Sequence, residues 1–192
     1  MDDIILPEES SVMGNKYEEK WLSTLHVTKF HFLDPSDDEI DIRDIAHALA
    51  FTCRYGGHIP VYYSVAEHCI RGLPYISDAD KLPWLLHDAE EAYIPDIPRP
   101  IKECSPEIKW LGEDLRKKIL KRFKAEKANW KKIRMVDDAM LMTEAKIFGF
   151  DISDWELCDV GTLDAVTKET VGWDPTTAEN LFLKFFNQYR RD

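Results

Sequence analysis

Apolar residues in this chain recur three and four positions apart, which is the spacing of one buried face of an α-helix. The pattern starts after Asp41, where Ile42, Ile45, Ala46 and Leu49 share a face. Strand-like alternation is scarce, so the sequence predicts an all-α fold with six or seven helices. We expect helices over these stretches: 42–53, from Ser64, about 79–93, from Ser105, about 129–148 and after Asp174-Pro175.

Two helix starts carry capping signals. Ser64-Val65-Ala66-Glu67 has the spacing of a capping box, in which serine and glutamate satisfy backbone N–H groups of the first turn. Ser105 is followed by Pro106, and a proline in the first turn loses no hydrogen bond there. A glycine-bearing loop over residues 54–63 separates the first two helices.

The 192 residues suffice for one domain with a real core, and we expect a single domain over 1–192. Residues 1–40 are mixed and polar, which predicts an irregular arm or a short pair of strands. The first residues lack the pattern of a signal peptide, and no apolar run approaches the length of a membrane span. We therefore expect a cytoplasmic protein that does not bind membranes.

The four cysteines are far apart and form no CxxC pair, so we expect reduced thiols. The net charge of −11 disfavours binding along duplex nucleic acid, where cationic patches supply the affinity. A small anionic substrate is compatible with this charge only if local cations overcome the field of the whole protein. The expected partners are a small-molecule substrate and further copies of the chain, as a homo-oligomer.

Ionisable residues interrupt three of the apolar stretches. His87 and Asp88 lie in the run LLHDAEEAYIPDIPRPIK, His68 lies on the preceding predicted helix, and Asp137 falls inside an apolar helical stripe. Burying a carboxylate without a partner costs several kcal/mol. One metal ion bound by these four residues would satisfy all of them.

Two imidazoles and two carboxylates balance a divalent cation and suit Mn²⁺, Fe²⁺, Co²⁺ or Zn²⁺, with positions left for water. Other interpretations stay open. The ion would be structural if it only tied the helices together. His68 would be a core histidine bonded to a backbone carbonyl, and Asp137 would be a cap or the partner of Arg134 or a lysine.

Glu91 and Asp96 add surplus negative charge. Glu91 stands four residues after His87, which predicts the same helical face, and three nearby prolines would fix Asp96 in the following loop. Either a second metal ion such as Mg²⁺ compensates these groups, or one of them has a raised pKa and acts as a general acid or base. The alternatives are an exposed helix charge for Glu91 and a turn-forming role for Asp96.

Cations and aromatic residues flank the same segments. Arg54, His58 and Lys102 are candidates for binding phosphate, and arginine offers a bidentate fork. Tyr55 is an aromatic candidate for contact with a base or sugar. Solvation at the surface, or burial in the core for the tyrosine, is the alternative for each of them.

The pattern of His68, His87-Asp88 and Asp137 resembles the H…HD…D signature of the HD-domain phosphohydrolase superfamily. The run HDAEEAYIPDIPRPIK, with YSVAEH before it and DDAMLMTEA after it, is similar to a subgroup of bacterial 5′-deoxynucleotidases and related phage enzymes. That subgroup includes dATP triphosphohydrolases of phages that replace adenine with aminoadenine. The resemblance covers about residues 41–150.

The resemblance implies an all-α HD-domain helical bundle with the four metal ligands named above. It places Asp137, not Asp138, in the site, because Asp137 stands seven residues before Glu144. It also implies catalytic or second-metal roles for Glu91 and Asp96.

The resemblance further implies that Arg54 and Lys102 contact phosphate. Two features depart from the family. The spacing of 19 positions from His68 to His87 is short, and Tyr55 stands where the bacterial enzymes have a tryptophan that contacts the sugar.

The implied activity is metal-dependent hydrolysis of 5′-deoxynucleotides, either dNTPs such as dATP or dNMPs. One alternative is HD-type hydrolysis of cyclic nucleotides or guanosine polyphosphates. Another is a non-catalytic nucleotide-binding sensor with one structural metal. A ferritin-like di-iron protein would need paired Glu-x-x-His motifs, and the sequence has none.

Overall fold

The computed structural model describes residues 20–157, 160–164 and 166–190, and within these ranges it is all-α. Residues 1–19 of the expected arm and Cys158 lie outside the described residues. Seven α-helices and four 3₁₀ turns make up the described part, which confirms the predicted fold class. They are α1 (Ile42–Phe51), η1 (Arg54–Gly57), α2 (Val65–Gly72), η2 (Leu73–Tyr75), η3 (Asp78–Asp80), α3 (Lys81–Leu85), η4 (Ala89–Ala92), α4 (Arg99–Glu103), α5 (Pro106–Arg122), α6 (Trp130–Phe148) and α7 (Pro175–Tyr189).

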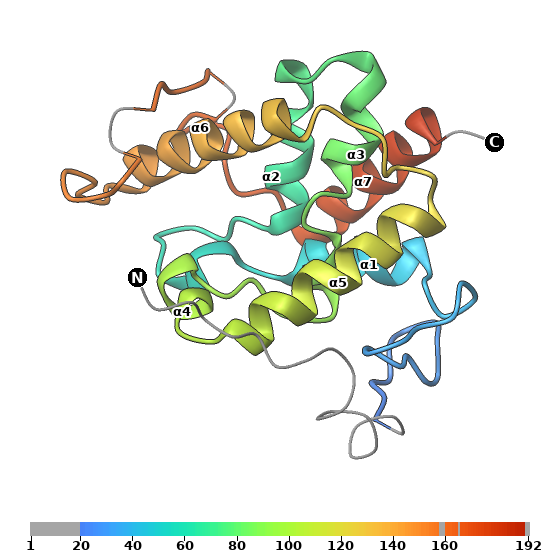
Figure 1. Cartoon of the computed structure of the whole chain (residues 1–192). Coiled ribbons are helices and arrows are strands. Elements are labelled where there is room, and N and C mark those ends of the chain that lie inside the picture. The colour runs from blue at the N-terminus through green and yellow to red at the C-terminus, as the bar shows by residue number, and fades with distance from the viewer. Residues whose placement is uncertain (1–19, 158–159, 165, 191–192) are drawn as a thin grey trace.

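Helix α7 is the centre of the packing, since α1, α2 and α3 all contact it. Helix α6 lies along one side of this group and contacts α2, while α5 packs against η4 (Figure 1). The largest side chains that are fully buried include Trp84, Tyr63, Phe30 and Phe182. None of the helices in the described ranges is both long and apolar enough to cross a lipid bilayer.

The predicted helix start at Ser64 is confirmed, although only half of the capping box forms. The Ser64 hydroxyl accepts a hydrogen bond from the Glu67 N–H. The Glu67 carboxylate does not return to Ser64. It accepts hydrogen bonds from Arg71 Nε and from the N–H groups of Gly172 and Trp173. Glu67 therefore fastens the segment before α7 to helix α2.

The single helix predicted over 79–93 is wrong, because the structure divides this stretch into η3, α3 and η4. The Trp84 carbonyl accepts hydrogen bonds from both the backbone N–H and the Nδ1 of His87, at 3.2 and 2.6 Å. A continuing α-helix would use that carbonyl for the N–H of Asp88. His87 and Asp88 consequently lie in a turn between two short helices.

Residues 20–40 contain no helix and run as an irregular segment with one antiparallel bridge, between Leu22 and Phe30. This agrees with the predicted arm over the part that is described. The Phe30 ring stacks on Tyr93, with centroids 3.7 Å apart and planes 4° from parallel. The stacked pair attaches the segment to the core next to η4.

Gly72 makes close helix packing possible at the end of α2. A Cβ added at this glycine would lie 2.0 Å from Cζ2 of the buried Trp84. We expect Gly72→Ala to lower the free energy of unfolding by about 2 kcal/mol or more, as overpacking of a core does. Gly112→Ala is the matched control, because its Cβ would come no closer than 3.8 Å to another residue.

The alanine in Gly112→Ala should leave stability unchanged or raise it by roughly 0.5–1 kcal/mol through helix propensity. Urea unfolding followed by circular dichroism measures both variants. Equal stabilities would contradict the close approach of Trp84 to α2.

Candidate metal centre

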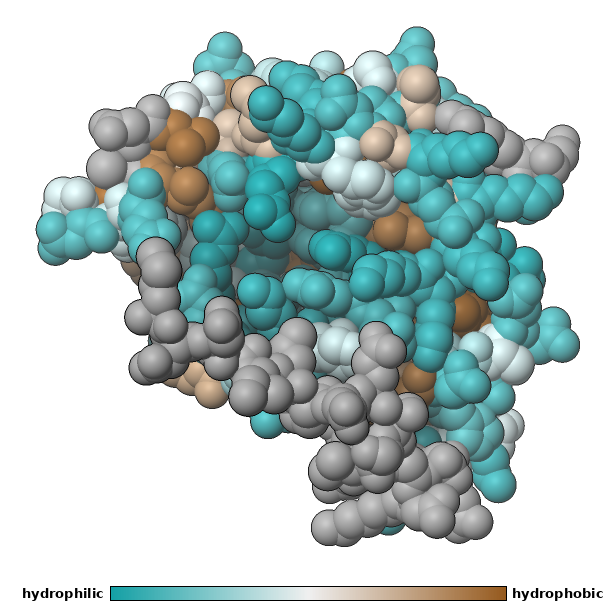
Figure 2. All heavy atoms as spheres, in the orientation of Figure 1, coloured by the Kyte–Doolittle hydropathy of each residue, from teal (hydrophilic) through white to brown (hydrophobic). Residues whose placement is uncertain are grey.

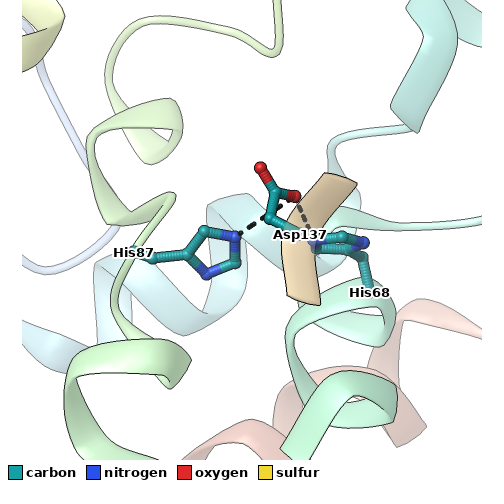
Figure 3. A group of neighbouring side chains, drawn as sticks. All are labelled: His68, His87 and Asp137. Atoms are coloured by element: carbon teal, nitrogen blue, oxygen red, sulfur yellow. Dashed lines mark ion pairs between the residues drawn. The ribbon is translucent and has the colours of Figure 1, made fainter. Parts of the chain in front are cut away.

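The four predicted metal ligands converge on one point. His68 comes from α2, His87 from the turn after α3 and Asp137 from α6 (Figure 3). Asp88 comes from the same turn as His87. The Oδ1 atom of Asp137 lies 3.3 Å from His68 Nε2 and 3.7 Å from His87 Nε2. The Oδ2 atom of Asp88 lies 3.3 Å from His87 Nε2 and 3.9 Å from His68 Nε2. We call these four residues the ligand cluster.

The break in the helix is what allows His87 and Asp88 to share the cluster. Consecutive residues of a regular α-helix point about 100° apart, so they do not face one ion. In the turn, both side chains are directed at the same place.

The face of the molecule bordered by α5 and α6 carries a hollow lined by hydrophilic residues (Figure 2).

Both imidazoles are oriented through their Nδ1 atoms. His68 Nδ1 donates a hydrogen bond to Glu144 Oε1 at 2.7 Å, and His87 Nδ1 donates to the Trp84 carbonyl. The Nε2 atoms point into the cluster, where they are buried and have no hydrogen-bond partner among the described residues. Metal-binding histidines are held in this way, with one ring nitrogen fixed by a carboxylate or carbonyl. The donor set fits a divalent transition metal.

The cluster concentrates negative charge in a buried place. Burial raises the pKa of Asp137, but its contacts with His68 and His87 outweigh that effect and hold the pKa well below its usual range. Burial lowers the pKa of His87, yet the carboxylate of Asp88 and other neighbours hold it well above the ordinary value. The cluster thus requires positive charge, and a metal ion would compete with protons for it.

Glu91 reaches the site from η4, so its predicted place on the same helical face as His87 is wrong. The side chain is 5% exposed, and Oε1 accepts a hydrogen bond from Lys102 Nζ at 2.8 Å. Oε2 is buried and has no hydrogen-bond partner among the described residues. Burial, followed by the charges of Asp88 and Asp96, raises the pKa of Glu91 well above its usual value. The surroundings of Glu91 therefore favour its protonated form.

Asp96 is partly buried in the loop between η4 and α4. Its charge raises the pKa values of Glu91 and Arg54, which places it near both of them. The structure thus brings Asp96 to the border of the site, on the side of Glu91. Lys102, in α4, provides the positive charge on that side.

Arg54, a predicted phosphate-binding residue, borders the ligand cluster. It is 8% exposed, its Nε donates to Glu144 Oε2 at 3.2 Å, and its Nη1 lies 3.7 Å from Asp88 Oδ2. Burial opposes the charged form, but Glu144 and Asp96 outweigh burial and raise the pKa of Arg54 well above its usual value. The site therefore keeps a permanent positive charge beside Asp88.

Tyr55 and His58 are placed differently from the other predicted residues. The Tyr55 ring packs against Phe148 and Phe150, and its hydroxyl lies 3.2 Å from both Glu144 Oε2 and the Leu141 carbonyl. Tyr55 therefore supports the site from behind Glu144. The His58 side chain is exposed at the end of η1, and no contact with the ligand cluster is found for it in the part of the chain that the structure describes.

The sequence predictions gave Glu144 no role, although it is the most strongly bonded acid in the site. It is fully buried and accepts hydrogen bonds from His68, Arg54, Tyr55 and Tyr63. Burial raises its pKa, but Arg54 and His68 outweigh burial and lower it. The signal was present in the sequence, because a glutamate inside an apolar helical stripe needs partners as much as an aspartate does.

Two further contacts complete the site. Asp138 points away from the cluster and pairs with Arg99, at 3.2 Å, which favours the choice of Asp137 over Asp138. Cys69 lies next to the ligands, with its Sγ 4.0 Å from His87 Nδ1, and burial raises the pKa of its thiol to about 11. The Trp84 carbonyl could not be predicted as a contact, since every residue has a carbonyl.

The chain is similar to proteins whose functions are not characterised. No family model matches the sequence. The uncharacterized protein YfdR of Escherichia coli K12 is 29% identical over 168 residues, which cover 87% of this chain and 94% of that protein. An uncharacterized protein of Rhodobacter capsulatus is 38% identical over 91 residues, which cover 43% of this chain and 46% of that protein. The function must therefore be argued from the site.

Two adjacent acids on α6 allow a direct test of the ligand cluster. Wild-type protein should bind about one Co²⁺ or Zn²⁺ per chain, and bound metal should raise its unfolding temperature. Asp137→Ala should lose both effects because it removes a ligand. Asp138→Ala should keep both, because Asp138 contacts Arg99 instead. Metal content by mass spectrometry and thermal unfolding with and without metal measure this, and equal metal loss in both variants would contradict the assignment.

Proposed function

We propose that this protein is a metal-dependent phosphohydrolase that acts on 5′-deoxynucleotides and has the fold of the HD-domain superfamily. The observation that carries the proposal is the ligand cluster. Two buried Nε2 atoms and two carboxylates face one point, and the guanidinium of Arg54 borders it. A purely structural ion would not need a buried arginine 3.7 Å from one of its ligands.

A divalent transition metal held by the cluster would polarise a phosphoryl oxygen and make a nearby water more acidic. Arg54 donates to the phosphoryl oxygens through the guanidinium edge that faces Asp88. Its other edge stays on Glu144, so the guanidinium is held in place while it binds the substrate. Lys102 adds a second positive charge, on the side of Glu91.

Glu91 is the proposed proton donor to the leaving group. Burial and the charges of Asp88 and Asp96 raise its pKa and favour the protonated form, so Glu91 can deliver a proton to the oxygen of the leaving group. Lys102 keeps Glu91 in position through the hydrogen bond to Oε1, while Oε2 stays available. The alternative, for a substrate that carries several phosphates, is that an ionised Glu91 shares a second ion such as Mg²⁺ with Asp96, and Glu91 is then not the proton donor.

The preference for deoxynucleotides rests on the resemblance in sequence to bacterial 5′-deoxynucleotidases and phage dATP triphosphohydrolases. The proposal assigns no stacking role to Tyr55, because its ring is packed against Phe148 and Phe150. Other groups would select the sugar. A site shaped around a deoxyribose disfavours ribose by steric and desolvation costs at the 2′-hydroxyl. A cytoplasmic location and a homo-oligomeric state belong to the same proposal.

A substrate panel tests the activity. We expect the Co²⁺- or Mn²⁺-loaded protein to hydrolyse dAMP or dATP with a higher kcat/KM than AMP or ATP, as measured by release of phosphate or triphosphate. Equal rates on ribo- and deoxynucleotides would remove the deoxy preference. Hydrolysis restricted to cyclic nucleotides or guanosine polyphosphates would favour that alternative chemistry, and metal binding without any hydrolysis would favour a nucleotide-binding sensor.

The proposed proton donor can be separated from the metal ligands. Glu91→Gln should keep the first metal ion but lower kcat by about 10²-fold or more, the usual effect of losing a general acid or base. Glu103→Gln is the control, because Glu103 is exposed at the end of α4. Turnover near the wild-type value in Glu91→Gln, with metal content equal in both variants, would assign Glu91 a structural role.

A further inference from the structure

One buried carboxylate joins the metal ligands to the phosphate-binding arginine. Glu144 Oε1 accepts hydrogen bonds from His68 Nδ1 at 2.7 Å and from the Tyr63 hydroxyl at 2.8 Å. Glu144 Oε2 accepts from Arg54 Nε and from the Tyr55 hydroxyl, both at 3.2 Å. The side chain is fully buried, so these donors take the place of solvent.

The four donors use the whole capacity of a carboxylate. An ionised glutamate offers two acceptor oxygens with about four lone-pair positions. A glutamine in its place would offer one acceptor oxygen, and its amide N–H groups would face two of the four donors. The arrangement therefore selects glutamate specifically, which a role limited to filling space in the core would not require.

The two histidine ligands differ in how they are held. A backbone carbonyl, that of Trp84, orients His87. His68 depends on the side chain of Glu144, and so does Arg54. A change at Glu144 should consequently disturb His68 and Arg54 together and leave His87 in place.

We propose that Glu144 is a positioning residue that holds the metal ligand His68 and the anion-binding Arg54 as one rigid unit. The arginine part of this inference rests on the proposed function, whereas the histidine part needs only the ligand cluster. Groups that orient a metal ligand from behind typically change metal affinity by about 10- to 100-fold when they are replaced. Replacing Glu144 should affect more than metal affinity, because the same carboxylate also fixes the guanidinium of Arg54.

The first measurement does not depend on any activity. In protein labelled with ¹⁵N-histidine, the Nδ1–H signals of His68 and His87 are recorded by NMR, with and without Zn²⁺. Glu144→Gln should shift or abolish the His68 Nδ1–H signal and leave the His87 signal unchanged. His87 thus serves as a control within the same molecule.

Two neighbouring tyrosines supply a milder pair of variants, in case Glu144→Gln does not fold. Tyr63→Phe removes the second donor to Oε1, so the remaining bond from His68 should shorten and its Nδ1–H signal should move downfield. Tyr62→Phe is the control, because the Tyr62 hydroxyl donates to the Ala50 carbonyl instead. Identical His68 signals in the two tyrosine variants would overturn the proposal.

The second measurement uses Co²⁺ and inorganic phosphate as probes. Glu144→Gln should weaken Co²⁺ binding by about 10- to 100-fold. It should also weaken phosphate binding to the Co²⁺-saturated protein by about tenfold or more, the equivalent of one hydrogen bond to a charged group. Glu67→Gln is the matched control, since Glu67 is equally buried and binds an arginine, but its carboxylate is directed at residues 172–173.

The outcomes separate this inference from the proposed function. Glu144→Gln with the same Co²⁺ affinity, phosphate affinity and His68 signal as Glu67→Gln would overturn the role of Glu144. A wild-type protein that binds Co²⁺ but hydrolyses no nucleotide would overturn the proposed function alone, because the His68 signal and the Co²⁺ affinity would still report on Glu144.

Discussion

The structure depends on the placement of two buried imidazoles around one partly buried carboxylate, that of Asp137. His68, His87 and Asp137 come from three separate segments, so their contact fixes α2, α6 and the turn after α3 relative to one another. Such a cluster costs free energy unless a cation compensates the negative charge of the aspartates. Here the cluster combines two buried imidazoles with two partly exposed carboxylates. The ring of each histidine is already oriented by a hydrogen bond at Nδ1, to Glu144 for His68 and to the Trp84 carbonyl for His87.

The all-α class could be predicted because helical periodicity is a property of many residues at once. The break after Leu85 could not, because residues 82–87 are buried in succession and show no periodicity that a break would interrupt. The helix ends where the backbone N–H and the ring of His87 both bond to the Trp84 carbonyl. Helix propensities and hydrophobic patterns do not reveal an individual contact of this kind. The same contact orients a proposed metal ligand, so the local departure from the predicted helix and the site have one cause.

The ligand cluster was predictable for a different reason. Each member is an ionisable residue in an apolar stretch, and such residues must find one another or a cation. Glu144 carries the same signal, yet the sequence did not show that four donors would meet at its carboxylate. For Tyr55, the sequence suggested contact with a base or sugar, whereas in the structure its ring is packed against other aromatic residues. Its backbone has a φ of +58°, and its ring packs into the aromatic cluster at the end of α6, which neighbouring residue types did not reveal.

Helix α2 contributes adjacent residues to the packing of the chain and to the candidate metal centre. Its residue Glu67 accepts hydrogen bonds from the N–H groups of Gly172 and Trp173, and the next residue is the candidate ligand His68. During synthesis, a growing chain that ends before residue 172 lacks the two N–H groups that bind the Glu67 carboxylate, and it also lacks the α7 surface on which α1, α2 and α3 pack. The order of synthesis therefore delays the formation of the candidate metal centre. His68, a candidate ligand, is synthesised before α7, and the helices that surround it have their common packing partner only when α7 has been made.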